Sequence, residues 1–311
     1  MPVVSAPSRI HISLIDLNGS LGRVDGGVGF ALQEPRVMVR VERSSELSVS
    51  GRHAEVAERA AERVLSAYSL PGARVEVLSA YPRHVGLGSG TQLSLAVARG
   101  ICSAYGIESS VRELAEITRR GGTSGIGVLA FETGGFVLDA GHAKKLKQEF
   151  LPSSASTAPP PVALMRRDMP DWEIAVVLPA WGERVHSRRE VNIFRDFCPL
   201  PLSQVQELCH ILLMKLLPSL VERDIESFGE GINMIQRVGF KSIELMLQRR
   251  EVRELLSLCQ RLSYGAGLSS FGPVIYAFPR SAAEFAEAVS SRSDVRCVWF
   301  TRADNRGAAV R

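Results

Sequence analysis

The stretch His84-Val-Gly-Leu-Gly-Ser-Gly-Thr-Gln-Leu93 decides the fold of this chain. Upstream of it, Val75 and Val77 alternate with polar residues as in a half-buried strand, and downstream the apolar residues recur at helical spacing as far as Cys102. Glycines permit a tight turn, so that several backbone N–H groups converge before a helix N-terminus, whose partial positive charge favours an anion. The stretch predicts a phosphate or diphosphate site, and a glycine-rich helix start without a ligand is the alternative.

Loop spacing and composition exclude several classes of protein. The loop has neither the Gly-Lys-Ser/Thr ending of a Walker A loop nor the three spaced glycines of a Rossmann loop. A net charge of +4 over 311 residues suits an anionic small substrate but is too mild for a nucleic-acid binder, and most of the basic pairs, of which Arg119-Arg120 is one, are expected on the solvated surface.

The five cysteines and the apolar runs indicate a cellular location. Their number is odd and they lack paired CxxC spacing, which predicts buried thiols in a reducing compartment and no zinc site. No apolar run reaches the roughly 18 residues of a membrane span, and no signal-peptide pattern follows Met1. We therefore expect a cytoplasmic protein with no membrane or nucleic-acid partner.

The order of the predicted elements indicates an α+β architecture with two domains. Residues 1–152 form the first domain, the Ser/Ala/Pro run 153–161 a linker, and residues 162–311 the second domain. The predicted strands are residues 9–14, 28–32, 35–42, 136–140, 172–178, 274–278 and 295–300. The predicted helices are residues 52–68, 203–217, 221–235, 251–262 and 282–290, and a short one that starts with a capping box at 110–113 and ends at 121–122.

Three further segments, residues 9–27, 121–127 and 269–272, are richer in glycine and polar residues than turns require. Glycine and serine loops on alternating elements suggest the walls of one polyanion site. The residues predicted to bind phosphate or diphosphate are Gly86, Leu87, Gly88, Ser89, Gly90, Thr91, Gln92, Gly122, Thr123, Ser124, Ser269, Ser270 and Gly272.

The first of these segments also carries candidate catalytic residues. On a strand, Arg9 and His11 share one face, which near the strand end could line a cleft. Asp16 and Asp25 follow on glycine-bearing turns, and two carboxylates near a diphosphate are natural Mg²⁺ ligands, although Asp also nucleates turns. His186, in a polar loop, is a further candidate for acid–base chemistry or a phosphate contact, with a structural histidine as the alternative.

Residues 82–93 resemble the second motif of the GHMP kinase superfamily, which reads Pro, three residues, then Gly-Leu-Gly-Ser-Ser, and residues 265–272 lie where its third motif is found. A closer resemblance is to the beta-ribofuranosylaminobenzene 5'-phosphate synthase family of that superfamily, which makes the arylribose of methanopterin. The segments that carry it are residues 8–27, 84–92, 120–127, 197–201 and 269–273. The resemblance implies an ATP-binding-like fold, with a ribosomal-S5-like N-terminal domain and a ferredoxin-like C-terminal domain, and it suits a homodimer.

The departures from the kinase pattern predict a different chemistry. Kinases of the superfamily carry Pro-Ser-Gly-x-Asp, whose Asp accepts the proton of the attacking hydroxyl, whereas this chain reads Thr123-Ser-Gly-Ile-Gly127. Gly90 likewise replaces the second serine of the kinase loop. Two alternatives stay open: an ATP-dependent small-molecule kinase, for which Glu132 is the nearest carboxylate, and a non-catalytic phosphate sensor.

The resemblance implies a decarboxylative glycosyl transfer. The donor is 5-phosphoribosyl 1-diphosphate and the acceptor is 4-aminobenzoate or 4-hydroxybenzoate. As diphosphate leaves, C1 of the ribose gains oxocarbenium character, the ring carbon that bears the carboxylate attacks it, and CO₂ departs.

Roles for the candidate residues follow from that reaction. Mg²⁺, held by Asp16 and Asp25, would stabilise the departing diphosphate together with the glycine loop. Arg9 or Arg23 would hold the benzoate carboxylate, though not so tightly that its loss is opposed. A hydrogen-bond acceptor near the para substituent would push electron density into the ring, and the candidates are His11 and His186.

Overall fold

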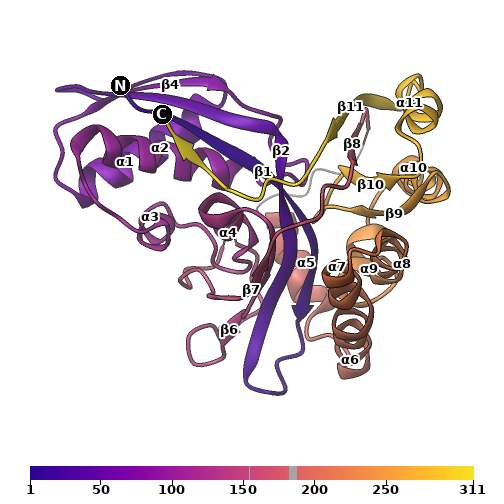
Figure 1. Ribbon diagram of the computed structural model, residues 1–311. Helices are drawn as coiled ribbons and strands as arrows, with labels where there is room; N and C mark the ends of the chain where they lie inside the picture. Colours follow the sequence, from indigo (N-terminus) through magenta and orange to yellow (C-terminus); the bar gives the residue numbers. More distant parts are fainter. Residues whose placement is uncertain (154, 182–187) are drawn as a thin grey trace.

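Two long strands form the spine of the larger sheet in the computed structural model, which describes residues 1–153, 155–181 and 188–311 (Figure 1). β1 (Val3–Asp16) and β2 (Arg23–Arg43) pair antiparallel over almost their whole length. The sheet runs in the order β12-β1-β2-β4-β3, and β5 and β6 also pair with β2 while β7 pairs with β5. The further strands are β3 (Ser48–Gly51), β4 (Ala73–Ser79), β5 (Phe136–Asp139), β6 (His142–Ala143), β7 (Ala163–Arg167) and β12 (Ala309–Val310).

The two strands predicted at 28–32 and 35–42 are one strand, β2. The register along β1 jumps from Ser8↔Leu32 to Pro7↔Arg36, so residues 33–35 form a bulge. Pro35 has no N–H to donate, and a bulge is where a sheet tolerates such a residue. Pairing resumes beyond the bulge because β1 continues on the same side.

Helices α1 (Ala54–Ala67) and α2 (Ser89–Tyr105) cover one face of this sheet, as Figure 1 shows. The helix start at Ser110 is confirmed, because the Ser110 hydroxyl accepts from the N–H of Glu113 at the start of α3 (Val111–Ile117), while the Glu113 carboxylate accepts from the hydroxyl of Tyr68. That helix ends earlier than predicted, because Thr118 closes it. After the glycine segment 121–127, α4 (Ile126–Thr133) leads into β5.

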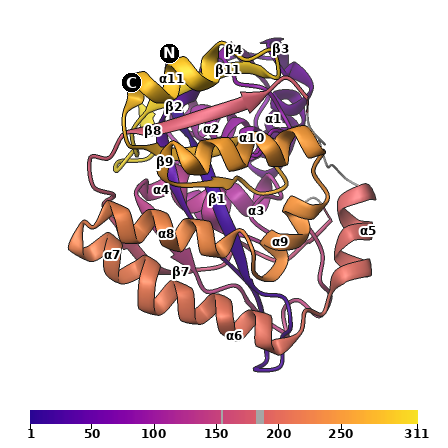
Figure 2. The same ribbon diagram turned by 90° about the vertical axis from the view of Figure 1, so that its right-hand side faces the viewer.

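The smaller sheet confirms the ferredoxin-like expectation. Its strands are β8 (Ile174–Pro179), β9 (Ser263–Leu268), β10 (Ile275–Pro279) and β11 (Val295–Thr301). They lie antiparallel in the order β11-β8-β10-β9, with helices inserted after β8 and after β10. The inserted helices are α5 (Arg188–Phe197), α6 (Leu202–Ile211), α7 (Leu217–Glu222), α8 (Ile225–Ile235), α9 (Gly239–Met246), α10 (Arg250–Arg261) and α11 (Ala282–Ser290), with a π-helical turn at Leu212–Leu216 (Figure 2).

Two sequence expectations in this half are wrong. The segment 265–272 was expected to be a loop, yet Gly265 and Gly267 lie in strand β9. A Cβ on Gly265 would lie 2.2 Å from the carbonyl oxygen of Gly229, so the glycine lets α8 pack directly on the strand. The helix predicted at 221–235 is interrupted, because Asp224 caps a new helix through the N–H groups of Glu226 and Ser227.

One apolar core joins the two sheets. Phe30 of the larger sheet contacts Tyr276 and Phe278 of the smaller one, at ring-centroid distances of 5.9 and 6.1 Å. Two strands of the predicted second domain, residues 162–311, also belong to the larger sheet. They are β7, which pairs with β5, and β12, which pairs with β1. In the described part of the chain, no helix has the length and apolar character needed to cross a bilayer.

Candidate active site

The glycine loop of residues 84–92 borders a cavity of about 220 Å³, here called the outer cavity. Its lining residues are Arg9, Arg83, His84, Gly86, Gly88, Ser89, Gly90, Thr91, Arg120, Gly121, Ser153, Glu190, Ser270, Phe271 and Gly272. The structure thus brings the glycine loop together with the turn between β9 and β10. Leu87 and Gln92, also predicted to bind phosphate, are instead buried in the core, where Gln92 Nε2 donates to the carbonyl of Gly127 at 2.7 Å.

Backbone contact holds the two loops against each other. Gly86 has φ +96°, and a Cβ there would lie 2.2 Å from the carbonyl oxygen of Ser269. The buried Ser269 hydroxyl donates to the Gly86 carbonyl at 2.6 Å and accepts from the N–H of His11 at 3.0 Å. Ser269 therefore positions both loops rather than facing the cavity, and only glycine permits so close an approach at position 86.

The outer cavity lies at the start of a long helix. Gly88, at φ +77°, precedes α2, and the first turn of α2 holds no acidic residue. The helix dipole is therefore not neutralised at this end, which favours an anion.

Two guanidinium groups add positive charge to the same cavity. Arg9 Nη1 donates to the Gly86 carbonyl at 2.5 Å, and Arg120 Nε donates to the hydroxyl of Ser94 at 3.2 Å. Burial lowers the pKa of Arg9 to about 10, and burial together with the neighbouring cation of Arg63 lowers the pKa of Arg120 to about 10. Both stay positively charged at neutral pH, so the cavity suits a phosphate or diphosphate.

Arg120 is an exception to the expectation that most of the basic pairs lie on the solvated surface. After α3 the chain reverses at Arg119, which has φ +55°, and the N–H groups of Arg119 and Arg120 donate to the carbonyls of Glu116 and Ala115. This helix-ending turn directs Arg120 toward the cavity. No sequence signal separates it from the other basic pairs, because the turn contains no glycine at its left-handed position.

A second cavity of about 130 Å³, the inner cavity, adjoins the first and shares Arg9 with it. Its lining residues are Arg9, His11, Leu14, Thr91, Gly121, Thr123, Ser124, Gly127, Pro152, Ser153, Glu190, Phe194, Glu244, Ser270 and Phe271. Phe194 and Phe271 form an apolar wall, and Phe240 packs against both, at centroid distances of 4.7 and 5.7 Å. A cavity with aromatic walls and a few polar groups suits a planar ring with polar substituents.

His11 stands in the inner cavity, as its place on β1 predicts. The side chain is 5% exposed, its Nε2 lies 3.1 Å from the hydroxyl of Ser124, and its Nδ1 is buried without a hydrogen-bond partner among the described residues. Burial, followed by the charges of Arg9 and Lys241, lowers the pKa of His11 well below its usual value. The imidazole is therefore neutral at neutral pH and keeps one nitrogen able to accept a proton.

Lys241 and Glu244, both buried on α9, were not predicted as site residues. They form an ion pair, and Lys241 Nζ also donates to the carbonyls of Leu268 and Ser270, at 3.1 and 3.3 Å. The lysine thus fixes the turn that closes both cavities, while Glu244 lines the inner one. The sequence signal that could have identified them is a pair of opposite charges three residues apart within an apolar stretch.

Asp16 and Arg23 do not reach either cavity. Asp16 Oδ1 accepts from the N–H groups of Asn18 and Gly19, both at 2.8 Å, so it shapes the turn after β1. Arg23 is exposed, and its guanidinium donates to the carbonyls of Ala140 and Gly141. For Asp16 the geometry favours the turn-forming alternative, and the Arg23 guanidinium contacts backbone carbonyls away from both cavities.

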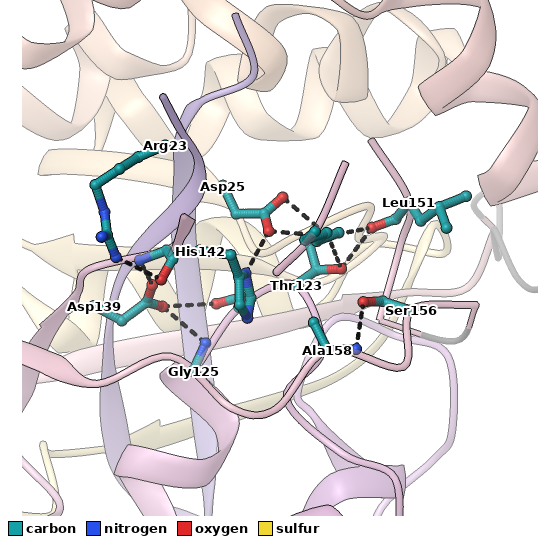
Figure 3. A network of polar contacts seen from close by, with 12 residues as sticks. Arg23, Asp25, Thr123, Gly125, Asp139, His142, Leu151, Ser156 and Ala158 are labelled. Carbon is teal, nitrogen blue, oxygen red and sulfur yellow. Dashed lines mark hydrogen bonds and ion pairs between the residues drawn. The ribbon is translucent and has the colours of Figure 1, made fainter. Parts of the chain in front are cut away.

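Asp25 belongs to a buried ion cluster behind the inner cavity (Figure 3). Its carboxylate lies 2.9 Å from Lys147 Nζ and 2.6 Å from His142 Nδ1. Lys147 also donates to the hydroxyl of Thr123 at 2.9 Å, and His142 Nε2 lies 2.8 Å from the carbonyl of Pro159. The cluster ties β2 to the residue 121–127 loop and to the segment that carries Ser153.

The described residues do not fit a magnesium site built on Asp16 and Asp25. The two residues are Cα partners across the β1–β2 ladder, but the Asp25 charge is already balanced by Lys147. Within residues 1–153, 155–181 and 188–311 there is no group of three or more His, Cys, Asp or Glu side chains that could hold a metal ion. The predicted Mg²⁺ therefore has no preformed cage in that part of the chain.

Four further residues are predicted for the site, namely Gly122, Thr123, Ser124 and His186. Thr123 and Ser124 line the inner cavity, whereas Gly122 is buried behind it, where a Cβ would lie 2.9 Å from Ser156. His186 lies outside the described residues.

The position of the kinase carboxylate lies at the inner cavity and holds no acid. Gly127 lines that cavity, and a Cβ there would lie 3.2 Å from the Thr91 side chain. Glu132, which the kinase alternative requires, is exposed on α4 and does not line either cavity.

The comparisons with known proteins agree with this fold. Models described as GHMP kinases N terminal domain and GHMP kinases C terminal match residues 55–135 and 216–294. Among solved structures, the homoserine kinase of Cytophaga hutchinsonii (TM-score 0.66, 17% identical, 99% of this chain and 96% of that one) and the mevalonate kinase of L. major (TM-score 0.69, 14% identical, 97% and 96%) are similar in fold.

Curated relatives are much more similar in sequence. The beta-ribofuranosylphenol 5'-phosphate synthase of Methanothermobacter thermautotrophicus is 45% identical over 320 residues, covering 98% of this chain and 97% of its own. The synthase of the same name from Archaeoglobus fulgidus is 48% identical over 279 residues, covering 89% and 87%. With this identity over nearly the whole length, and with a GHMP kinase fold that holds glycine in place of the kinase carboxylate, the chain belongs to the beta-ribofuranosylphenol 5'-phosphate synthase family of the GHMP kinase superfamily.

Proposed function

We propose that this enzyme joins 5-phosphoribosyl 1-diphosphate to 4-hydroxybenzoate and releases the ribofuranosylphenol 5'-phosphate, CO₂ and diphosphate. The relatives are named for a phenol product. A phenol ring retains the hydroxyl of 4-hydroxybenzoate, whereas 4-aminobenzoate would yield an aminobenzene. The family name therefore favours the hydroxy acceptor of the two that the sequence left open.

The observation that carries the proposal is the pair of adjoining cavities. The outer cavity combines the α2 N-terminus with Arg9 and Arg120, which suits the diphosphate of the donor. The inner cavity has the aromatic wall of Phe194 and Phe271, which suits a benzoate ring. Donor and acceptor would then meet where the two cavities join.

Arg9 lies at that junction, since it lines both cavities. From there its guanidinium can bind the benzoate carboxylate or the diphosphate, and Gly86 already takes one of its donors. Because Arg9 also donates to Gly86, it would bind the carboxylate less tightly. This suits the reaction, since a carboxylate that is bound too tightly in the ground state would resist leaving as CO₂.

The proposed reaction is an electrophilic substitution on the ring. The C1–diphosphate bond of the ribose breaks, and the ring carbon that carries the carboxylate forms the new carbon–carbon bond with C1. Loss of CO₂ returns its bonding electrons to the ring and restores aromaticity. Cationic and N–H groups around the outer cavity would stabilise the leaving diphosphate.

The proposal includes Mg²⁺, bound to the donor substrate. Because Asp16 and Asp25 do not fit a cage, we propose that Mg²⁺ enters bound to the diphosphate oxygens, as is common for this ion. Activity should fall when EDTA removes the metal and return when Mg²⁺ is added in excess. Full activity in EDTA would exclude this part of the proposal.

A homodimer in the cytoplasm, acting on small molecules without nucleic-acid or membrane partners, completes the proposal. Sedimentation of the purified chain at several concentrations would test the dimer. A single species of 33.9 kDa would contradict it.

The decisive experiment uses each benzoate labelled at its carboxyl carbon. Purified protein, Mg²⁺ and phosphoribosyl diphosphate should release labelled CO₂ and diphosphate in equal amounts from 4-hydroxybenzoate. Release from 4-aminobenzoate alone would move the assignment to the amino acceptor. No release from either acceptor, with ATP consumed when alcohols are supplied, would support the kinase alternative instead.

A further inference from the structure

Three side chains from separate elements form a line, and two of them, His11 and Ser124, line the inner cavity. His11 of β1 lies with Nε2 3.1 Å from the Ser124 hydroxyl, which precedes α4. That hydroxyl in turn lies 3.4 Å from Oδ2 of Asp139, at the end of β5. Neither Ser124 nor Asp139 has a role in the proposed glycosyl transfer.

The carboxylate at the end of this line is held rigidly. Asp139 is 1% exposed, and it accepts from the N–H of Gly125 at 2.8 Å through Oδ2 and from the N–H of Gly141 at 2.9 Å through Oδ1 (Figure 3). Both contacts come from backbone, so the carboxylate cannot rotate away without breaking them. Its position next to Ser124 is therefore built into the fold.

The hydrogen bonds from His11 through Ser124 to Asp139 determine which nitrogen of the imidazole carries the proton. When Asp139 is ionised, the Ser124 hydroxyl donates to it and accepts from Nε2–H of His11. Nδ1 of His11 then carries no proton, and it is the buried atom without a partner among the described residues. A neutral Asp139 could donate to Ser124 and reverse the line, which would place the proton on Nδ1.

We infer that Asp139, acting through Ser124, holds His11 in the tautomer whose Nδ1 accepts the proton of the acceptor's para-hydroxyl. The inference rests on the proposed function, and it names the group that binds the para-hydroxyl of the acceptor. Asp139 and Ser124 are positioning residues in this account, and His11 is the residue that touches the substrate.

The proton and the electrons balance without a further reactant. As the ring carbon bonds to C1 of the ribose and diphosphate leaves, the para-hydroxyl becomes a protonated ketone oxygen and releases its proton to Nδ1. The carbon–carbon bond to the carboxylate then breaks, CO₂ leaves, and the bonding pair flows back through the ring to that oxygen. His11 returns the proton there, so the phenol is regenerated and the imidazole is neutral again.

The charges around His11 fit a base of this kind. Arg9 and Lys241 lower its pKa, and Glu244 lines the same cavity as a partner of Lys241. A weak base is sufficient, because the hydroxyl is strongly acidic once the ring has begun to attack. The imidazole therefore takes the proton during the reaction and not before it.

The charges around Asp139 give the line a pH dependence. Burial raises the pKa of Asp139 to about 7, the backbone N–H groups of Gly141 and Gly125 oppose that shift, Asp25 adds to it, and His142 opposes it. Because the working tautomer needs the ionised carboxylate, kcat should rise between about pH 6 and 8.

The test compares Ser124→Ala and Asp139→Asn with the unaltered enzyme. We expect kcat for 4-hydroxybenzoate to fall about 100-fold in each variant, with the Kd for phosphoribosyl diphosphate, measured by calorimetry, changed less than about threefold. The rise of kcat through pH 7 should vanish. The more acidic acceptor 3-fluoro-4-hydroxybenzoate should recover part of the loss, because its hydroxyl gives up the proton more readily.

Ser8→Ala is the matched control, because Ser8 is a buried serine on the same strand as His11 and lines neither cavity. It should leave kcat and the pH profile unchanged. If Ser124→Ala keeps the kcat and pH profile of the unaltered enzyme, or loses the same factor with both acceptors, the inference fails while the proposed function stands. If the unaltered enzyme makes no product from either benzoate, the proposed function fails first.

Discussion

At the scale of single residues, the local backbone geometry decides which charged side chains reach the site. Arg120 and Arg119 are neighbours in the sequence, yet the turn after α3 leaves Arg119 exposed and carries Arg120 to the outer cavity. The Arg120 guanidinium lies among cations, with Arg63 and Arg83 both lowering its pKa. Such a group gains most from an anion, because a diphosphate would relieve the repulsion and replace the lost hydration.

Arg120→Ala should therefore raise the KM for phosphoribosyl diphosphate by about 10- to 100-fold, the effect of losing a charge-assisted hydrogen bond. The KM for the benzoate should change little, because Arg120 does not line the inner cavity. Steady-state kinetics with each substrate varied in turn would measure both. Arg74→Ala, at an exposed arginine of the larger sheet, is the control, and an equal KM in both variants would contradict the role.

Asp139 also makes stability depend on pH. Its pKa is raised from 3.8 to about 7 by burial, so the folded chain binds this proton more tightly than the unfolded chain. The stabilisation is complete at low pH and is lost as the pH rises toward 7. Urea unfolding at pH 5 and pH 8 should show the unaltered protein losing free energy of unfolding relative to Asp139→Asn, and equal changes in the two proteins would refute the assignment.

At the scale of elements, close packing of α8 on β9 positions the turn that closes both cavities. A Cβ on Gly229 of α8 would lie 2.3 Å from the carbonyl carbon of Tyr264, and the approach is as close at Gly265. Neither backbone can yield without moving the other. Because β9 runs directly into Ser269 and Ser270, a shift of the strand would reach the site.

Gly229→Ala should destabilise the fold by about 3 kcal/mol through this overpacking and lower activity in parallel. Gly231→Ala on the same helix is the control, since its Cβ would lie 3.1 Å from a side-chain methyl of Leu216 and 3.6 Å from the Leu216 Cα, and alanine is favoured in a helix by up to about 1 kcal/mol. Denaturant unfolding would compare the two. Equal stability in both variants would mean that the helix can move away from the strand at little cost.

At the scale of the whole molecule, the chain end fastens the two sheets together. After β11 leaves the smaller sheet, Asp304 pairs with Arg36 of β2, and β12 then pairs with β1. The Asp304 carboxylate also accepts from the N–H groups of Arg306 and Gly307. Both partners of the ion pair are mostly shielded, with side chains 9% and 19% exposed.

Asp304→Ala should lower the free energy of unfolding by about 2 to 4 kcal/mol, because it leaves the Arg36 charge shielded and unpaired. Asp171→Ala, which removes an exposed pair with Arg302, should change it by less than about 1 kcal/mol. Thermal and urea unfolding would compare the two variants. A loss in Asp304→Ala no larger than in the control would show that the returning tail contributes little.

The sequence by itself determined the glycine loop, the α+β class, the family and the absence of the kinase carboxylate at Gly127. These are local features, in which neighbouring residues set turn geometry, helix capping and apolar periodicity. The ferredoxin-like second sheet was expected from the resemblance to the GHMP kinase superfamily. Arg9 and His11 were found because strand alternation places them on one face.

Only the tertiary structure decided which polar groups meet. It removed Asp16 and Arg23 from the site, paired Asp25 with Lys147, and brought Arg120 to the outer cavity. It also brought Asp139, 128 positions after His11, into line with that imidazole through Ser124. Such contacts join residues far apart in the chain, and they depend on how β1, β5 and the loops pack, which periodicity and spacing along a sequence do not encode.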